Sequence, residues 1–170
     1  ARFLVGRYSK NLGARKVLIV TDDGIIKAGW VADIITSLEE YNIDYTIYSD
    51  VTANPRSQEV TKGADLYNKE DCNAIVAVGG GSPMDCAKAI GIISSGDSNI
   101  VNFEGVDKID VPIPPLICIP TTAGSAADVS QFAIIKDETR NLKMTIASRA
   151  IVPDIALIDP MVLTTKPPYL

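Results

Sequence analysis

The chain has 170 residues, of which 46% are hydrophobic, 6% aromatic and 22% charged, and its net charge is -5. This length and apolar content suffice for one well-packed domain and exclude a disordered chain. Because aromatic residues are few, the core must consist mainly of Val, Ile, Leu and Ala, which suits parallel strands buried on both faces. The composition therefore favours an α/β fold, with residues 1–170 as a single domain.

The residue counts also exclude several partners and kinds of site. The 16 basic residues are scattered along the chain, so they form no electrostatic footprint for a nucleic acid. The chain contains no histidine, and it therefore lacks the commonest general base and the commonest transition-metal ligand. We predict neither a catalytic residue nor a metal ligand within this chain.

The cysteines and the apolar runs indicate a compartment. Cys72, Cys86 and Cys118 are an odd number and form no Cys-x-x-Cys pair, which argues against a disulfide framework. The longest apolar runs, such as residues 74–78, are far shorter than the roughly 20 residues that a membrane span needs, and no secretory leader opens the chain. We expect a soluble, cytoplasmic protein that does not bind a membrane.

Three strand–helix units follow one another in the first half. Short β-branched or apolar runs alternate with segments whose apolar residues recur every three or four positions. The expected strands are Lys16–Thr21, Tyr45–Tyr48 and Ala74–Val78, and the expected helices are Trp30–Tyr41, Gln58–Asn68 and Pro83–Ile93. Successive units of this kind imply a parallel sheet with right-handed crossovers. We therefore predict a Rossmann-like parallel sheet flanked by helices.

The second half is expected to be less regular. Residues 96–115 mix Gly, Asp, Asn and Pro, which is typical of a long surface connection. Further strands are expected at Leu116–Ile119 and Ile155–Ile158. Gln131–Ile135 and Lys143–Ala147 flank a polar turn, which predicts a β-hairpin at the edge of the sheet.

A triple glycine followed by a serine, Gly79-Gly80-Gly81-Ser82, lies between the third strand and its helix. Backbone N–H groups and the helix dipole converge at such a point, and glycines let the backbone form a nest around an anion. We predict a pyrophosphate as the ligand, with the hydroxyl of Ser82 as a further donor. The alternative is a tight turn that uses the glycines for geometry alone.

Asp22 directly follows the first strand. Its carboxylate can accept hydrogen bonds from ribose hydroxyls but repels a 2′-phosphate, so NAD is predicted in preference to NADP. The alternative is that Asp22 or Asp23 caps a helix or turn. The acid precedes the glycines, the reverse of the G-x-G-x-x-G fingerprint, and no Walker loop is present, so phosphoryl transfer is disfavoured.

Other polar residues follow strand ends or the glycines. Thr121, Thr122 and Ser125 lie in a turn after the fourth strand, where they either cap the turn or contact a ligand. Asp85 is expected in the first turn of the helix, where it would stabilise the terminus, and Lys88 is expected to be an ordinary solvated residue. Because parallel strands end at one sheet edge, a shared crevice is predicted there.

Four motifs in a consistent order resemble the iron-containing (group III) alcohol dehydrogenases: Gly79–Asp85 with Lys88, Pro120–Ser125, Asn54-Pro55 and Asp159-Pro160. The resemblance runs from about Gly6 to Leu170. It implies an N-terminal α/β domain that binds NAD or NADP, followed by an all-helical domain that holds a divalent metal through one aspartate and three histidines. None of those ligands is matched, so the helical domain is expected to be absent from this chain.

By matched position, the resemblance implies cofactor-binding roles for ten residues. Those around the pyrophosphate and the nearby ribose are Gly80, Gly81, Ser82 and Asp85; the adenosine ribose is assigned to Asp22, the adenine side to Thr121, Thr122 and Ser125, and a place near the nucleotide to Asn54 and Lys143. The loop at residues 124–129 reads Gly-Ser-Ala-Ala-Asp-Val, where many members of the family read Gly-Thr-Gly-Ser-Glu-Val, so one glycine and one hydroxyl are lost.

The resemblance implies an NAD(P)-dependent oxidoreductase that interconverts alcohols and aldehydes or ketones, with iron as the expected metal. This chain would then supply the dinucleotide site and be inactive alone. Both of its ends are expected to be trimmed, and the Thr- and Pro-rich residues 163–170 are expected to be the beginning of a longer segment. The full-length protein is expected to form a homo-oligomer. One alternative is a stand-alone nucleotide-binding or interaction module. The other is an enzyme with a different phosphate ligand, such as a dehydroquinate synthase-like or glycerol dehydrogenase-like relative.

Overall fold

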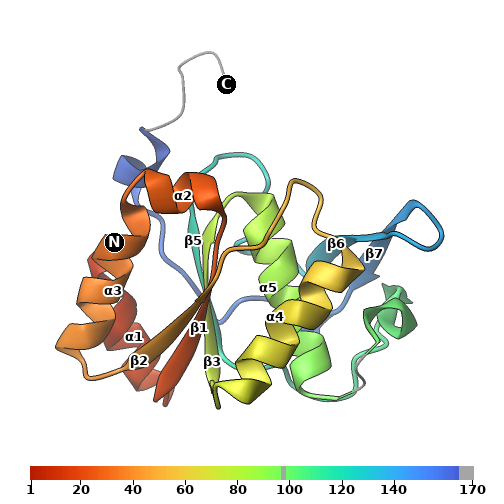
Figure 1. Ribbon diagram of the computed structural model, residues 1–170, viewed down its shortest axis with the longest axis horizontal. Helices are drawn as coiled ribbons and strands as arrows, with labels where there is room; N and C mark the ends of the chain where they lie inside the picture. Colours follow the sequence, from red (N-terminus) through yellow and green to blue (C-terminus); the bar gives the residue numbers. More distant parts are fainter. Residues whose placement is uncertain (97–98, 165–170) are drawn as a thin grey trace.

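Five parallel strands form the main sheet of the computed structural model, which describes residues 1–96 and 99–164 (Figure 1). These strands are β1 (Lys16–Val20), β2 (Asp44–Tyr48), β3 (Ala74–Gly79), β5 (Leu116–Pro120) and β8 (Ile155–Ala156). Their order in space is β2-β1-β3-β5-β8. Numbered among themselves, they follow the 2-1-3-4-5 order of one common class of doubly wound sheets. The predicted parallel, Rossmann-like sheet is confirmed.

Helices cover both faces of this sheet, and the strand sequences show why. In β1, Val17 and Ile19 belong to one buried apolar cluster, whereas Leu18 and Val20 belong to the other. Such alternation with both sets buried is expected of a strand that is covered on both faces. The covering helices are α1 (Val5–Asn11) and α3 (Trp30–Glu40) on one face and α4 (Ser57–Lys69) and α5 (Gly81–Ser94) on the other (Figure 1).

The two short helices α1 and α2 (Asp23–Lys27) were not predicted from the sequence. Helices of this length gain little from intrinsic propensity, and their stability comes from tertiary contacts. In α1, the amide of Gly6 donates to Oγ of Ser37 at 3.1 Å, and this hydroxyl donates to the carbonyl of Phe3 at 2.7 Å. These contacts join segments 31 and 34 residues apart, so a local sequence pattern cannot predict the helix that they stabilise.

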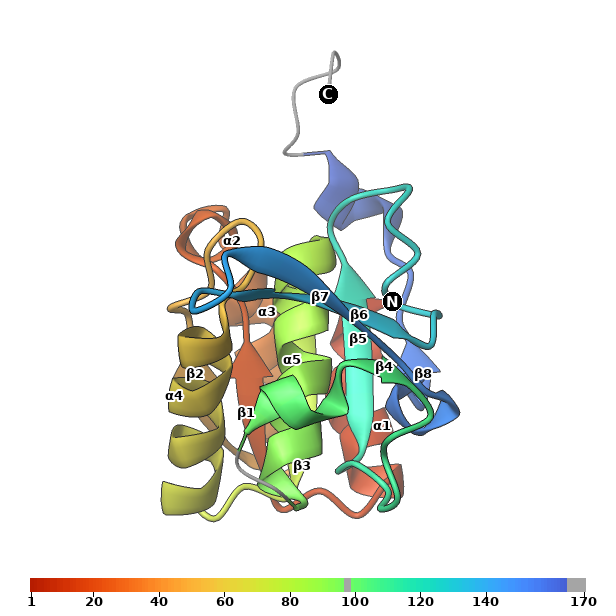
Figure 2. The same cartoon turned by 90° about the vertical axis from the view of Figure 1, so that its right-hand side faces the viewer.

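A second sheet is formed by β4 (Gly105–Val106), β6 (Phe132–Asp137) and β7 (Leu142–Ala147), in the order β4-β7-β6. The predicted hairpin is confirmed as β6–β7, but its predicted place at the edge of the main sheet is wrong. The side of β5 away from β3 pairs with β8, and the apolar side chains of Ala133 and Ile135 pack in the core that α4 and α5 share. The hairpin therefore crosses over α5 as a separate layer (Figure 2).

The connection between α5 and β5 is more structured than expected. Residues Ile100–Phe103 form a 3-10 turn, and β4 follows it. Ile100 is buried and packs in the core beside α4 and α5. The described part of residues 96–115 is therefore not only a surface connection.

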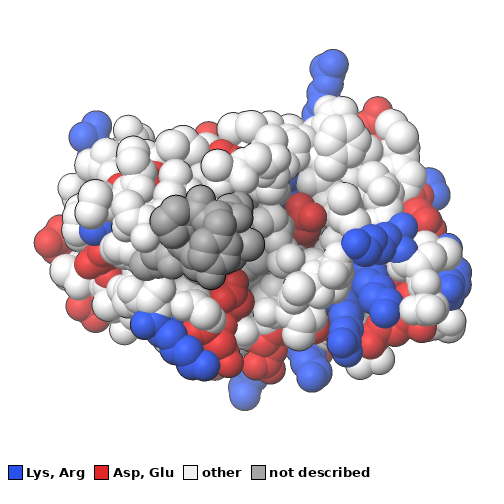
Figure 3. Space-filling model, turned by 90° about the horizontal axis from the view of Figure 1, so that it is seen from above, with Lys and Arg blue, Asp and Glu red and all other residues white. Residues whose placement is uncertain are grey.

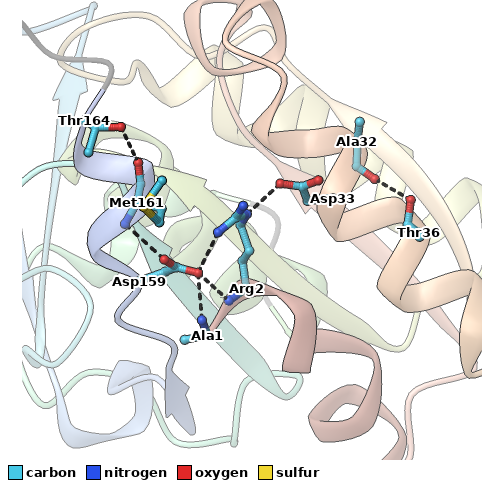
Figure 4. Close-up of polar contacts among 8 residues, drawn as sticks. All are labelled: Ala1, Arg2, Ala32, Asp33, Thr36, Asp159, Met161 and Thr164. Atoms are coloured by element: carbon cyan, nitrogen blue, oxygen red, sulfur yellow. Dashed lines mark hydrogen bonds and ion pairs between the residues drawn. The ribbon is translucent and has the colours of Figure 1, made fainter.

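Both ends of the described chain meet at Asp159 (Figure 4). Oδ2 of this buried carboxylate accepts hydrogen bonds from the Ala1 ammonium at 2.7 Å and from Nη1 of Arg2 at 2.9 Å. Nε of Arg2 also donates to Oδ2 of Asp33 on α3 at 2.6 Å. A 3-10 turn, Pro160–Leu163, follows Asp159, and the Thr- and Pro-rich residues 165–170 lie outside the described part of the chain.

Candidate functional site

A crevice of about 510 Å³ opens at the carboxyl ends of β1, β3 and β5. Four loops line it, at residues 22–25, 51–53, 80–83 and 121–122. The crevice lies where β1 has β2 on one side and β3 on the other. This is the switch point of the sheet, at which ligands of doubly wound folds bind. The predicted shared crevice is thus present.

The glycine turn after β3 leaves little room for side chains at its three glycines. Gly79 has φ of +148°, and a Cβ there would lie 2.7 Å from Cγ of Pro83. A Cβ on Gly80 would lie 3.2 Å from the side chain of Thr122, and one on Gly81 would lie 3.3 Å from Cβ of Ser125. The glycines therefore let the loop after β5 come against the turn and leave a cradle that a side chain would fill.

The start of α5 offers donors to this cradle. The N-cap of this 14-residue helix is Gly80, which has no side chain to cap the first amides. The amides of Gly81 and Ser82 precede the first intrahelical hydrogen bond, and they lie at the positive end of the helix dipole. Oγ of Ser82, which accepts from the amide of Asn54 at 3.4 Å, lines the same crevice. This arrangement can bind a phosphate group.

Asp22 lines the crevice and also caps a helix. Its Oδ1 accepts a hydrogen bond from the amide of Ile25, the third residue of α2, at 3.0 Å. The interpretation of Asp22 as a cap is therefore confirmed. Within residues 1–96 and 99–164 no hydrogen bond is made to Oδ2, so this oxygen is available to a ligand. The cap and the predicted ribose contact are compatible.

The other predicted hydroxyls lie close to the glycine turn. Thr121 is buried and Thr122 half-buried, and both line the crevice. Ser125 is exposed, lies against Gly81, and accepts from the amide of Ala127 at 3.4 Å. Asn54 is exposed beside the lining residues with φ of +59°, a left-handed conformation that asparagine tolerates.

Asp85 and Lys143 do not line the crevice. Asp85 is the fifth residue of α5, so its expected place in the first turn of that helix is wrong. Its half-buried carboxylate accepts from the amide of Ile134 at 3.2 Å, and burial raises its pKa to about 6. Lys143 is exposed on β7, opposite Lys136 of β6. The ligand roles predicted for Asp85 and Lys143 stay predictions.

Lys88 is completely buried, so its expected solvated position is wrong. Its Nζ donates to the carbonyls of Ser130 at 2.8 Å and Phe132 at 2.9 Å, and it lies 3.4 Å from Oγ of Ser130. Burial lowers the pKa of Lys88, and the negative charge of Asp85 opposes that shift. Most residues of α5 are apolar, as in a buried helix, but the acceptors that satisfy Lys88 lie 42 and 44 residues away in the sequence.

The three cysteines are buried and free. Burial raises the pKa of Cys72 to about 11 and that of Cys118 to about 12, and it raises that of Cys86 further. Thiols so far from ionisation are poor nucleophiles. In the described ranges, no three His, Cys, Asp or Glu side chains are grouped to hold a metal ion.

In the view from above, most of the Lys and Arg side chains that can be seen lie toward the rim of the molecule (Figure 3). Among the helices within residues 1–96 and 99–164, none combines the length and the apolar character that a membrane crossing requires.

The comparisons with known proteins agree with one another. A family model described as iron-containing alcohol dehydrogenase matches residues 2–160. The chain is 42% identical over 161 residues to a choline dehydrogenase of Bacillus subtilis, covering 93% of this chain and 40% of that protein. It is 34% identical to an NAD-dependent methanol dehydrogenase of Bacillus methanolicus, covering 96% of this chain and 43% of that protein.

Solved structures give the same result. A 1,3-propanediol oxidoreductase superposes with a TM-score of 0.96 at 34% identity, covering 98% of this chain and 44% of the other. The chain thus spans only about two fifths of the length of the curated relatives that it matches.

Proposed function

The chain belongs to the iron-containing alcohol dehydrogenase family, and we propose that it forms the dinucleotide-binding part of an NAD-dependent oxidoreductase that interconverts alcohols and aldehydes or ketones. The observation that carries this proposal is the crevice at the switch point of the sheet, where an uncapped helix start faces a free carboxylate oxygen of Asp22. One end of this crevice suits a phosphate and the other a ribose.

The residues of the crevice fit NAD part by part. We assign the pyrophosphate to Gly80, Gly81 and Ser82, because a side chain at either glycine would fill the cradle and Ser82 lines it. Oδ2 of Asp22 would accept from a ribose hydroxyl, and it would repel the 2′-phosphate of NADP.

Five further residues belong to the proposed set. Thr121 and Thr122 line the crevice on the side of β5, and Ser125 lies in the same loop, against Gly81. Asn54 and Lys143 are assigned by the family resemblance, Asn54 next to Ser82 and Lys143 on the hairpin.

This chain would bind and orient the cofactor, and the substrate and the metal would be held with the rest of the enzyme. A divalent metal, expected to be iron, would supply Lewis-acid chemistry toward the alcohol oxygen, and NAD would supply the hydride acceptor. We accordingly propose that residues 1–170 alone bind NAD without dehydrogenase turnover. For the whole enzyme we propose a cytoplasmic homo-oligomer.

Calorimetric titration with NAD+ and NADP+ tests the proposal. The informative variant is Asp22→Ser, which keeps a capping oxygen for the amide of Ile25 but removes the charge. We expect wild type to bind NAD+ at least tenfold more tightly than NADP+, and the variant to lose most of that preference. Asp65→Ser, at an exposed residue of α4 that does not line the crevice, is the matched control.

Two results would count against the assignment. A preference for NAD+ that is the same in Asp22→Ser and wild type would overturn the role of Asp22. Tighter binding of ATP or a sugar phosphate than of NAD+ would instead support an enzyme with a different phosphate ligand.

A further inference from the structure

We propose that Lys88 and Asp85 are positioning residues that hold the outer edge of β6, and with it the loop at residues 121–131, against the nucleotide crevice. The effect on the ligand rests on the function proposed above. The contact itself does not, because it is visible in the protein alone.

The outer edge of β6 is the side that does not pair with β7. Residues at alternate positions of an edge strand direct their backbone groups away from the partner strand. Here the carbonyl of Phe132 accepts from Nζ of Lys88, and the amide of Ile134 donates to Oδ2 of Asp85. The next such amide, that of Lys136, donates to the carbonyl of Pro55 at 2.7 Å. An edge that would otherwise be open is thus covered by groups of α5 and of the segment before α4.

Lys88 supplies the stronger half of this contact. A buried ammonium is costly unless its hydrogen bonds are satisfied, and among the described residues the acceptors of Lys88 come from Ser130 and Phe132. No carboxylate in residues 1–96 and 99–164 lies within 4 Å of Nζ to form an ion pair. The ammonium is therefore satisfied only while the end of the loop at residues 121–131 lies against α5.

The loop at residues 121–131 is consequently anchored at its start to the glycine turn and at its end to α5. At its start, the amide of Thr121 donates to the carbonyl of Gly79 at 2.8 Å. At its end, Ser130 is held by Lys88, which lies two helical turns beyond Gly81 on the same helix. Between the two anchors, Ser125 rests against Gly81. A rigid helix therefore sets the distance between the cradle and the hydroxyls that face it.

Hydrogen exchange measured by mass spectrometry tests this contact without a ligand. We expect Lys88→Met to accelerate amide exchange at least tenfold in peptides from residues 122–134, with no change in α1 and α3. We also expect the Kd for NAD+ to rise at least tenfold. Lys69→Met, at an exposed lysine of α4, should match wild type in both measurements.

Asp85 provides a second pair of variants that alters only a half-buried group. Asp85→Asn keeps an oxygen for the amide of Ile134 and should exchange like wild type. Asp85→Ala removes the acceptor and should accelerate exchange at residues 133–135. If Asp85 acted only on the ligand, neither variant would change exchange in the nucleotide-free protein.

The outcomes separate this inference from the proposed function. The positioning role is overturned if amide exchange in Lys88→Met is accelerated uniformly over the whole chain or not at all. If Lys88→Met does not fold, the role is overturned by exchange in Asp85→Ala that equals that of wild type. A wild type that fails to bind NAD+ while the local acceleration is seen refutes the proposed function and leaves the contact standing. Local acceleration with an unchanged Kd for NAD+ refutes the effect on the ligand alone.

Discussion

The two sheets of the molecule are held in different ways. Every residue of β3 and β5 is buried, so the main sheet is fixed by apolar contacts on both faces. In β6, by contrast, buried Ala133 and Ile135 alternate with exposed Phe132 and Ile134. The second sheet has only one buried face among its described residues, and polar groups of α5 bind the outer edge of β6. Apolar packing fixes the first sheet, whereas a few long-range hydrogen bonds locate the second.

The largest effect is expected in the main sheet. Ile75 is fully buried in β3, and Ile75→Ala should lower the free energy of unfolding by about 4 kcal/mol because it leaves a cavity in the central strand. Chemical denaturation measures this loss. Ile47→Ala, on the outer strand β2 where the side chain is 37% exposed, should cost about 1 kcal/mol or less.

A matched pair in β6 tests the second sheet. Ile135→Ala should cost about 3 kcal/mol, since the side chain is completely buried in the core beside α5. Ile134→Ala, at the neighbouring residue on the exposed face, should cost under about 1 kcal/mol. Equal losses of stability in the two variants would mean that the face of β6 with Phe132 and Ile134 is covered in solution.

The contacts of Asp159 test whether polar groups also matter beside the main sheet. Asp159→Asn should cost about 2 kcal/mol at neutral pH, because the buried carboxylate accepts charged hydrogen bonds. The Ala1 ammonium lowers the pKa of Asp159, against the effect of burial, and the Arg2 and Met161 amides lower it further. A depressed pKa stabilises the fold above the unfolded value of about 3.9.

The same variant therefore has a pH signature. The advantage of wild type over Asp159→Asn should shrink as the pH falls below about 4, toward the lower pKa of the folded state. Thermal unfolding between pH 7 and pH 2 measures it. A difference that stays constant over this range would show that the charge of Asp159 contributes nothing.

The smallest effect is expected at Asp85. Burial raises its pKa to about 6, so the stability linked to its protonation is fully present below about pH 4 and is lost as the pH rises through 6. Relative to Asp85→Asn, wild type should therefore gain about 2 °C in Tm between pH 7 and pH 5. A relative loss of Tm over that interval would contradict the assignment of burial as the dominant cause.

Prediction from the sequence succeeded where the information is local. The burial of β1, β3 and β5 follows from short apolar runs. The position of Asp22 in the same crevice as the glycine turn follows from the rule that parallel strands end at one edge of the sheet. It failed where the information is distant. Lys88 resembles a surface residue until its acceptors, 42 and 44 residues away, are in place.

The position of the second sheet was missed for the same kind of reason. The hairpin itself is specified by a polar turn between two apolar strands, but its docking depends on β8 taking the free side of β5. A strand was predicted there, at Ile155–Ile158, and β8 spans Ile155–Ala156, but its sequence does not show which strand it pairs with. The ligand contacts of Asn54 and Lys143 rest on resemblance alone, because neither position has a local chemical signature.

The pairing of β3 on both sides has a consequence for aggregation. This strand reads Ala-Ile-Val-Ala-Val-Gly and pairs with β1 along one edge and with β5 along the other. Its partner β5 begins only at residue 116, so a chain still being synthesised carries β3 for some 40 residues with one edge unpaired. An uncharged, β-branched edge of this kind readily recruits strands from other molecules. The central strand of the folded sheet is thus open to pairing with other molecules until β5 has been synthesised.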